Sequence, residues 1–225
     1  MKTMVLASAS PRRKELLELI GLKFKVDPTD TVELLDETIE PHELTRRLSL
    51  EKAQLSARRN TDAIVIAADT IGVLNGRVIG KPRAETEARD MLKFLSGKCH
   101  RVITGFTIID TDTGKTLSRS VETGVYFREL ADGDIDAYIR SGEPMDKAGA
   151  YAIQGLGSLL VQKIEGDYFN VMGLPLSDLA EALKEFGVDV LLSAANRAQS
   201  DQVSRERKLP PSGLPGTRSK KLPED

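Results

Sequence analysis

Residues 63–70, which read AIVIAADT, decide the fold of this chain. A continuous apolar run without polar alternation is typical of a strand that is buried on both faces of an α/β sheet. Asp69 and Thr70 follow this run, and the ligands of open α/β sheets bind beyond the carboxyl ends of strands. An Asp in that place can hold a divalent cation or accept a proton from water. Taken alone, Asp69 is more simply interpreted as a residue that initiates a turn.

The segments on either side of this run alternate between strand and helix patterns, which predicts a mixed α/β sheet. Strands are expected at residues 3–7, 24–26, 63–68, 101–110, 116–127 and 159–164. Helices are expected to begin at Pro11 and Pro41 and to cover about 84–95, 132–138 and 176–186. Asp132 or Asp134 is the expected cap of the fourth helix, and Asn75-Gly76 predicts a β-hairpin.

The composition narrows the class of protein. The chain has 225 residues, of which 40% are hydrophobic and 29% charged, as in ordinary globular domains. A net charge of −2 gives no electrostatic argument for nucleic acid binding. Cys99 is the only cysteine, so an intramolecular disulfide is excluded. No signal sequence or membrane span is evident. We therefore expect a cytoplasmic protein without nucleic acid or membrane partners.

The sequence patterns divide the chain in two. Residues 1–194 carry all the strand and helix patterns and are expected to form one domain. Residues 195–225 hold four of the ten prolines, few large apolar residues, and seven Lys/Arg against four Asp/Glu. This composition predicts a disordered, mildly basic tail. The alternative is a targeting or partner-binding segment.

The residues from Ser8 to Arg13, SASPRR, lie where a strand meets the start of a helix. Backbone N–H groups and the positive end of the helix dipole point at an anion in such a junction. Two hydroxyls and the guanidiniums of Arg12 and Arg13 add further donors for a phosphate. The alternative is that Ser10 caps the helix and both arginines are solvated.

Two later segments offer further polar groups. Gly80-Lys81-Pro82 places a Lys on a stiff turn, which suits a phosphate, although a surface Lys is the simpler interpretation. The stretch 143–175 is rich in glycine and charge, which favours a close backbone approach to a ligand or, alternatively, structural loops. Within it, the amide of Gln154 can both donate and accept, as reading a base edge requires.

Six segments in this order closely resemble motifs of the Maf family of nucleoside triphosphate pyrophosphatases. They are LASASPRRKELL, AADT, GKP, SGKCHRVITG, EPMDKAGAYAIQG and GDYFNVMGLPL, and the resemblance covers about residues 3–188. It implies a two-lobed α/β fold with an elongated mixed sheet, a cleft between the lobes and often a homodimer. The implied reaction is cleavage of a nucleoside triphosphate to its monophosphate and pyrophosphate.

The resemblance also implies residue roles. Asp69 matches the general base or metal-anchoring carboxylate, and Glu33 lies near a second family carboxylate. The implied cofactor is a divalent cation, Mg²⁺ or Mn²⁺. The triphosphate site would be lined by Ser8, Arg12, Arg13, Lys52 and Lys81. The residues Arg12, Thr70 and Gln154 match the specificity positions of the branch that prefers dTTP and UTP. His100 is expected to have a structural role.

Two other functions stay open at this level. The first is a regulatory nucleotide-binding protein in cell division, although the full set of charged site residues argues against an inactive enzyme. The second is a house-cleaning pyrophosphatase for other non-standard nucleotides, such as ITP or XTP. Gln154 and Thr70 disfavour the second function only through the resemblance.

Overall fold

The described residues of the computed structural model are 2–29 and 38–196. The chain divides into two units, Met1–Val190 and Leu191–Asp225, and the first unit holds the sheet and the cavity. Glu33 and most of the tail predicted at 195–225 lie outside the described residues. The domain boundary expected after residue 194 stays a prediction.

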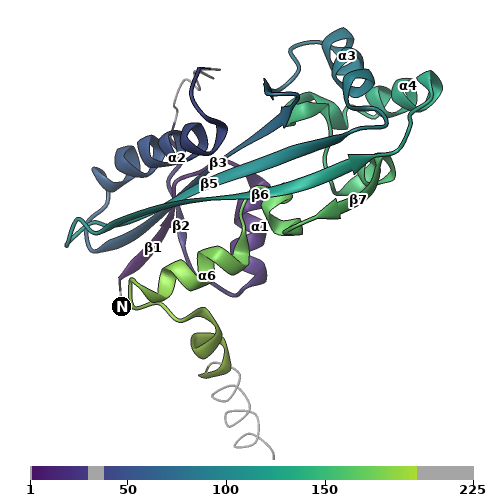
Figure 1. Ribbon diagram of the computed structural model, residues 1–225. Coiled ribbons are helices and arrows are strands. Elements are labelled where there is room, and N and C mark those ends of the chain that lie inside the picture. The colour runs from purple at the N-terminus through teal and green to yellow at the C-terminus, as the bar shows by residue number, and fades with distance from the viewer. Residues whose placement is uncertain (1, 30–37, 197–225) are drawn as a thin grey trace, which may run out of the picture. The chain divides into compact units, whose positions relative to one another are not determined.

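The described residues form a seven-stranded mixed sheet in the order β2-β1-β3-β5-β6-β7, with β4 paired to β3 (Figure 1). Strand β1 pairs in parallel with β2 and β3, and the remaining pairs are antiparallel. The strands are β1 (Thr3–Leu6), β2 (Lys25–Val26), β3 (Ala63–Leu74), β4 (Arg77–Ile79), β5 (Cys99–Asp110), β6 (Thr116–Phe127) and β7 (Val161–Glu165).

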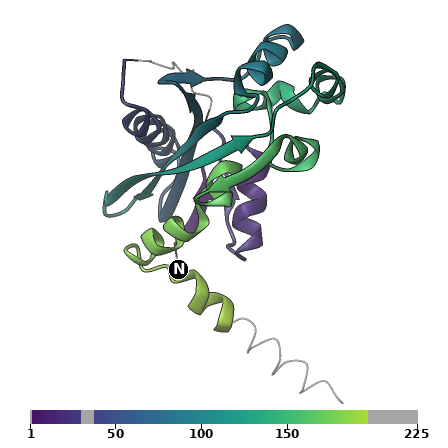
Figure 2. The ribbon, with the colours of Figure 1, turned by 45° about the vertical axis from the view of Figure 1, so that its right-hand side comes forward.

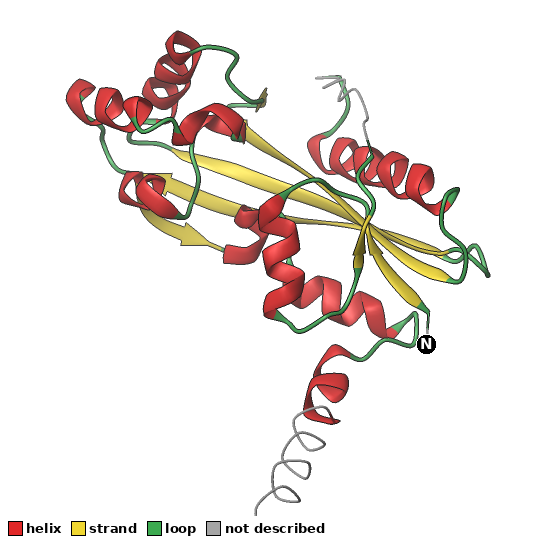
Figure 3. Cartoon of the chain, turned by 180° about the vertical axis from the view of Figure 1, so that it is seen from behind, coloured by secondary structure: helices red, strands yellow, loops and turns green. Residues whose placement is uncertain are grey.

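Helices cover both faces of this sheet. They are α1 (Pro11–Leu19), α2 (Pro41–Ala57), α3 (Glu85–Leu95), α4 (Asp132–Arg140), α5 (Tyr168–Met172) and α6 (Leu176–Lys184). Three short 3₁₀ helices are η1 (Glu143–Asp146), η2 (Ala148–Ala150) and η3 (Gly155–Leu160). Helix α2 lies on one face of β3 and β5, whereas α1 and α6 lie on the opposite face (Figure 2, Figure 3).

The alternation of side chains along β3 explains this arrangement, because successive residues of a strand point to opposite faces. Ile64 and Ile66 pack with leucines of α1 and α6. Val65 and Ala67 belong to a separate cluster with Ala53 of α2. Both faces are therefore covered, as the uninterrupted apolar run 63–68 predicts.

Two large hydrophobic clusters occupy opposite ends of the long strands. One contains residues of β1, α1 and α6, and the other contains Leu92 of α3, Ile135 of α4 and Phe127 of β6. Because β3 and β5 contribute to both clusters, the two packed ends share one continuous sheet. The mixed α/β fold with two lobes is thereby confirmed.

Helix α2 approaches the sheet closely at Gly105, the residue paired with Asp69 in the β3–β5 ladder. A Cβ atom at Gly105 would lie 2.3 Å from the backbone carbonyl carbon of Thr45 in α2. Only glycine allows such an approach. This contact fixes the distance between the sheet and the helix that carries Lys52.

Several sequence predictions need correction. The strand predicted to end before Asp69 continues to Leu74, because β5 pairs with it as far as Val73. Asp132 and Asp134 lie in the first turn of α4 and do not cap it, since the N-cap residue is Ala131. The strand expected from residue 159 begins at Val161, after η3. The stretch 143–175, for which structural loops were one of two interpretations, contains the five-residue helix α5.

Candidate functional site

A cavity of about 560 Å³ opens along the edge of β3. On this edge β1 pairs with β3 up to Ile66 and β4 pairs with it from Gly72. Neither of these strands pairs with residues 67–71, and Asp69, Thr70 and Ile71 of this stretch line the cavity. Asp69 therefore lies beyond the carboxyl end of the parallel strand β1, although it is not at the end of its own strand. That is the position at which α/β sheets bind ligands.

The loop from β1 to α1 forms one wall of the cavity. Ser10 is the N-cap of α1 and accepts a hydrogen bond from the backbone N–H of Arg13, at a donor–acceptor distance of 3.5 Å. The Ser8 hydroxyl oxygen, which is buried, accepts from the backbone N–H of Ser10 at 3.2 Å. The helix N-terminus thus opens toward the cavity, as an anion site requires.

Arg13 is held by contacts from all three of its guanidinium nitrogens. They donate to the backbone oxygen of Gly173 at 2.9 Å, to the hydroxyl of Ser8 at 3.1 Å and to the hydroxyl of Thr70 at 3.2 Å. The Thr70 hydroxyl is in turn 2.9 Å from that of Thr104. Ser10 caps the helix, as the alternative interpretation expected, but Arg13 is fixed in the cavity wall by hydrogen bonds to the protein. Phosphate binding by this loop stays a prediction.

Lys52 and Asp69 form a buried ion pair in the cavity wall. Lys52 comes from α2, and the alternation along β3 turns Asp69 toward the same face of the sheet. Their side chains are only 8% and 5% exposed. Two charges buried so deeply stabilise each other only as a pair. The structure thus brings together two residues that the resemblance assigned to one site.

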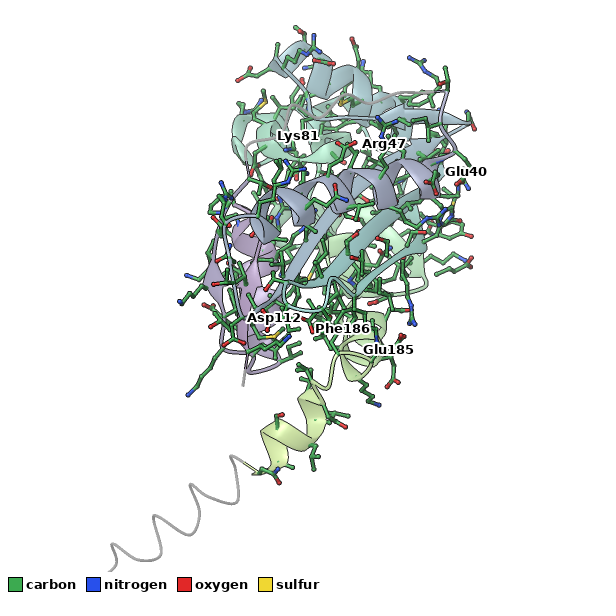
Figure 4. The ribbon with its side chains drawn as sticks, turned by 90° about the vertical axis from the view of Figure 1, so that its left-hand side faces the viewer. Glu40, Arg47, Lys81, Asp112, Glu185 and Phe186 are labelled. Carbon is green, nitrogen blue, oxygen red and sulfur yellow. The ribbon has the colours of Figure 1, made fainter. Side chains whose placement is uncertain are left out.

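The opposite wall comes from the second lobe, which is the end of the sheet that packs against α3 and α4. It includes Lys81, Asp146 and Lys147. The ammonium of Lys147 pairs with Asp146, and the backbone N–H of Gly149 donates to the backbone oxygen of Gly80 at 2.9 Å, which ties η2 to the Lys81 loop. In Figure 4 Lys81 lies toward the end of the unit opposite to Asp112.

Arg12 and Asp146 interact electrostatically. Partial burial raises the pKa of Asp146, but the hydrogen bond and charge of Lys147, together with the charge of Arg12, outweigh it and lower the pKa. Both residues line the cavity. A negatively charged ligand would meet Arg12, Arg13, Lys52, Lys81 and Lys147 around Asp69.

Gln154 is not among the residues that line the cavity, although Ile153 directly before it is. It precedes η3, and its side chain is half-buried. Of the residues assigned from sequence, the structure gathers seven around this one cavity: Ser8, Arg12, Arg13, Lys52, Asp69, Thr70 and Lys81.

His100 lies in the cavity wall and is almost completely buried. Its Nε2 atom is 2.8 Å from the hydroxyl of Tyr151, and its ring makes edge contacts with Tyr151 and Phe127. Burial lowers the pKa of His100 to about 4, so the imidazole is neutral at pH 7. These contacts agree with the structural role that the sequence suggested, which stays a prediction.

The polar cavity residues Asp146, Lys147 and Tyr151 are among those that received no individual role from the sequence. The signal was present in the dense segment 143–151, EPMDKAGAY, because charges beside glycines indicate a loop near a ligand. Which of these charges faces the cavity depends on the two consecutive 3₁₀ helices, which have no periodicity that a sequence could reveal.

The fold and the cavity define a mixed α/β protein with a cleft in which cationic side chains surround one buried carboxylate. The chain belongs to the family described as Maf-like protein, whose model matches residues 3–186. The membership confirms the resemblance found in the sequence motifs.

Similar proteins include bacterial chains of comparable length. A relative from Bacillus cereus (strain ATCC 10987 / NRS 248) named dTTP/UTP pyrophosphatase is 50% identical over 190 residues, which cover 84% of this chain and 93% of the relative. A Bacillus anthracis relative of the same name is 48% identical, with coverage of 84% and 98%. A solved structure, the Staphylococcus aureus Ham1 protein, is 18% identical over 58% of this chain and 73% of that chain, with a TM-score of 0.40.

Within residues 2–29 and 38–196, no helix is both long and apolar enough to cross a membrane.

Proposed function

We propose that this chain hydrolyses dTTP and UTP to the monophosphate and pyrophosphate. Membership of the Maf-like family supports the proposal, as do the relatives named dTTP/UTP pyrophosphatase. The observation that carries it is the cavity itself, in which Asp69 is buried among cationic side chains from both lobes. Phosphoryl-type chemistry needs mainly positioning and electrostatic stabilisation, which such a cavity provides.

In this proposal each wall has its own task. Asp69 orients or deprotonates the water that attacks the α-phosphorus, and the bond from that phosphorus to the bridging oxygen breaks. Ser8 and the N-terminus of α1 bind phosphate oxygens together with Arg13. Lys52 and Lys81 hold the charge that develops on the leaving pyrophosphate.

The donor set of the cavity fits a divalent cation that is held largely by the substrate. Among the described residues, no group of three or more His, Cys, Asp or Glu side chains could hold a metal ion by itself. Mg²⁺ is commonly bound by one or two carboxylates plus substrate phosphates, and Asp69 supplies a carboxylate in the cavity wall. We propose Mg²⁺ or Mn²⁺ held by Asp69 and by Glu33. When bound, the cation neutralises charge on the phosphate oxygens.

Base selection is assigned to Arg12, Thr70 and Gln154, following the family resemblance. Thr70 is fixed by Arg13 and Thr104, so its hydroxyl is oriented before substrate binds. The substrate set of this proposal is pyrimidine triphosphates, including modified uridine forms. We further propose a cytoplasmic protein that works as a homodimer, without nucleic acid or membrane partners.

The test is incubation of the purified chain with Mg²⁺ or Mn²⁺ and dTTP, UTP, CTP, ITP or 7-methyl-GTP, with chromatographic separation of the products. Monophosphate and pyrophosphate formed fastest from dTTP or UTP support the proposal. Fastest turnover of ITP or 7-methyl-GTP keeps the reaction but refutes the specificity assignment. Tight binding of dTTP without turnover refutes the enzyme and favours a regulatory nucleotide-binding protein.

A further inference from the structure

Glu143 connects two segments of the second lobe. Its Oε1 atom accepts hydrogen bonds from the Tyr138 hydroxyl at 2.9 Å and from the backbone N–H of Gly157 at 3.0 Å, and its Oε2 atom accepts from the backbone N–H of Leu156 at 3.1 Å. Its backbone oxygen accepts from the ammonium of Lys147 at 3.2 Å. One residue thus contacts both the turn that bears Lys147 and the start of η3.

Tyr138 extends this connection to the cavity wall. Its hydroxyl donates to Glu143 and accepts from the backbone N–H of Ala152 at 3.2 Å. Tyr138 is almost completely buried, and burial raises the pKa of its hydroxyl, which keeps the proton that it donates. Ala152 lines the cavity between Tyr151 and Ile153.

The contact between Glu143 and η3 is tight. Gly155 has a φ of +64°, and a Cβ atom there would lie 2.7 Å from Oε2 of Glu143. The carboxylate therefore lies directly against the backbone and accepts from two consecutive N–H groups, as a cap does at the start of a helix. Moving the carboxylate would release the start of η3.

We infer that Glu143 is a positioning residue for base recognition, which holds the segment 151–157 against the cavity. This segment contains Tyr151, Ala152 and Ile153 of the cavity wall and also Gln154. Glu143 itself does not line the cavity, so it acts through these residues. The inference rests on the proposed function, because Gln154 reads a pyrimidine base only there.

The test compares Glu143→Gln with a matched control. Gln keeps one acceptor, but its amide group faces the N–H of Leu156 or Gly157 and cannot accept from it. Tyr138→Phe removes the second link independently. The control is Glu122→Gln, because the Glu122 carboxylate is also hydrogen-bonded, in its case to the side chains of His42 and Arg101, but lies outside the cavity wall.

Two readouts separate positioning from general stabilisation. The first is kcat and KM for dTTP, UTP and CTP. A misplaced recognition segment raises KM for dTTP on the order of 10–100-fold and weakens the preference for dTTP over CTP, with a smaller change in kcat. The second is amide hydrogen exchange in peptides that cover 151–157, which we expect to accelerate about tenfold in Glu143→Gln.

Glu143→Asp keeps the charge with a shorter reach and should give intermediate values in both readouts. A Glu143→Gln protein with the discrimination and the 151–157 exchange of the Glu122→Gln control overturns the inference. Equal acceleration of exchange throughout the chain, without loss of discrimination, also overturns it, since that is a purely structural role. If the unmodified chain turns over no pyrimidine triphosphate, the proposed function fails, and the exchange measurement alone decides whether Glu143 positions the segment.

Discussion

Replacing Lys52 by Met tests whether the buried ion pair supports the fold as well as the chemistry. The substitution removes the ammonium that Asp69 faces, while both side chains are at most 8% exposed. Breaking a buried pair from one side costs about 3–5 kcal/mol. We take the lower end, about 3 kcal/mol, because the pair lines an open cavity. At 2–4 °C per kcal/mol for a domain of this size, Tm should fall by about 6–12 °C.

The double variant Lys52→Met/Asp69→Asn supplies the decisive comparison. It removes both charges, so it should recover most of the stability that either single variant loses. Urea unfolding of the four proteins at pH 7 measures the coupling. A loss below about 1 kcal/mol for Lys52→Met, or losses that simply add in the double variant, would refute the reasoning.

The same variants report on turnover. Asp69→Asn is expected to lower kcat by about 100-fold or more, because it removes the proposed base. The matched control is Asp110→Asn, since Asp110 lies on the neighbouring strand β5, also pairs with a lysine, Lys2, and is outside the cavity. It should keep normal turnover. Near-normal activity of Asp69→Asn would contradict the assigned role.

Four further predictions concern single features. Gly105→Ala should cost about 1–3 kcal/mol, because the new methyl group collides with the backbone of α2, whereas Gly133→Ala, which meets no atom within 4 Å, should not destabilise the chain; urea unfolding distinguishes the two. Arg13→Lys should lower kcat/KM for dTTP about 10–100-fold, since Lys cannot reach three partners at once, while Arg47→Lys on the outer side of α2 serves as the unaffected control. His100 has a folded pKa of about 4 against 6.5 when unfolded, so the unfolded chain binds the proton first and stability falls as pH drops from about 6.5 to 4. The loss at pH 5 should be about 2 kcal/mol by urea unfolding, and His100→Asn should remove this slope. EDTA should abolish turnover and added Mg²⁺ should restore it; full activity in EDTA would contradict the proposed cofactor.

Much of the fold could be predicted from local patterns. The run 63–68 indicated a doubly buried strand, and Pro11 and Pro41 marked the starts of α1 and α2 correctly. The end of β3 could not be predicted, because Asp69 is a poor strand residue that only pairing with β5 keeps extended. Helix α5 could not be predicted either, because its five residues are too few to establish a helical period.

Less of the candidate site than of the fold could be predicted from the sequence alone. The residues around Arg13 and Asp69 could be identified as site candidates, because they are polar and lie next to a predicted strand or helix end. Lys52 carries no such signal, because a lysine in the middle of an amphipathic helix is normally solvated, and only the closely packed sheet buries it beside Asp69. The contacts of Glu143 with Leu156 and Gly157 depend on chain segments that meet only after folding.

The unbroken ladder between β3 and β5 has a mechanical consequence. It runs from Ile64–Asp110 to Val73–Arg101, past the whole length of the cavity. Hinge bending needs a few residues that can absorb a large change in backbone angles, and paired strands resist such changes. The β3–β5 ladder therefore forms a rigid side of the cavity. The other sides include the loop between β1 and α1 and the segment 146–153, which are not part of the ladder. If the chain acts on nucleotides as proposed, changes in those two segments would alter the cavity without disturbing the β3–β5 ladder or the two hydrophobic clusters.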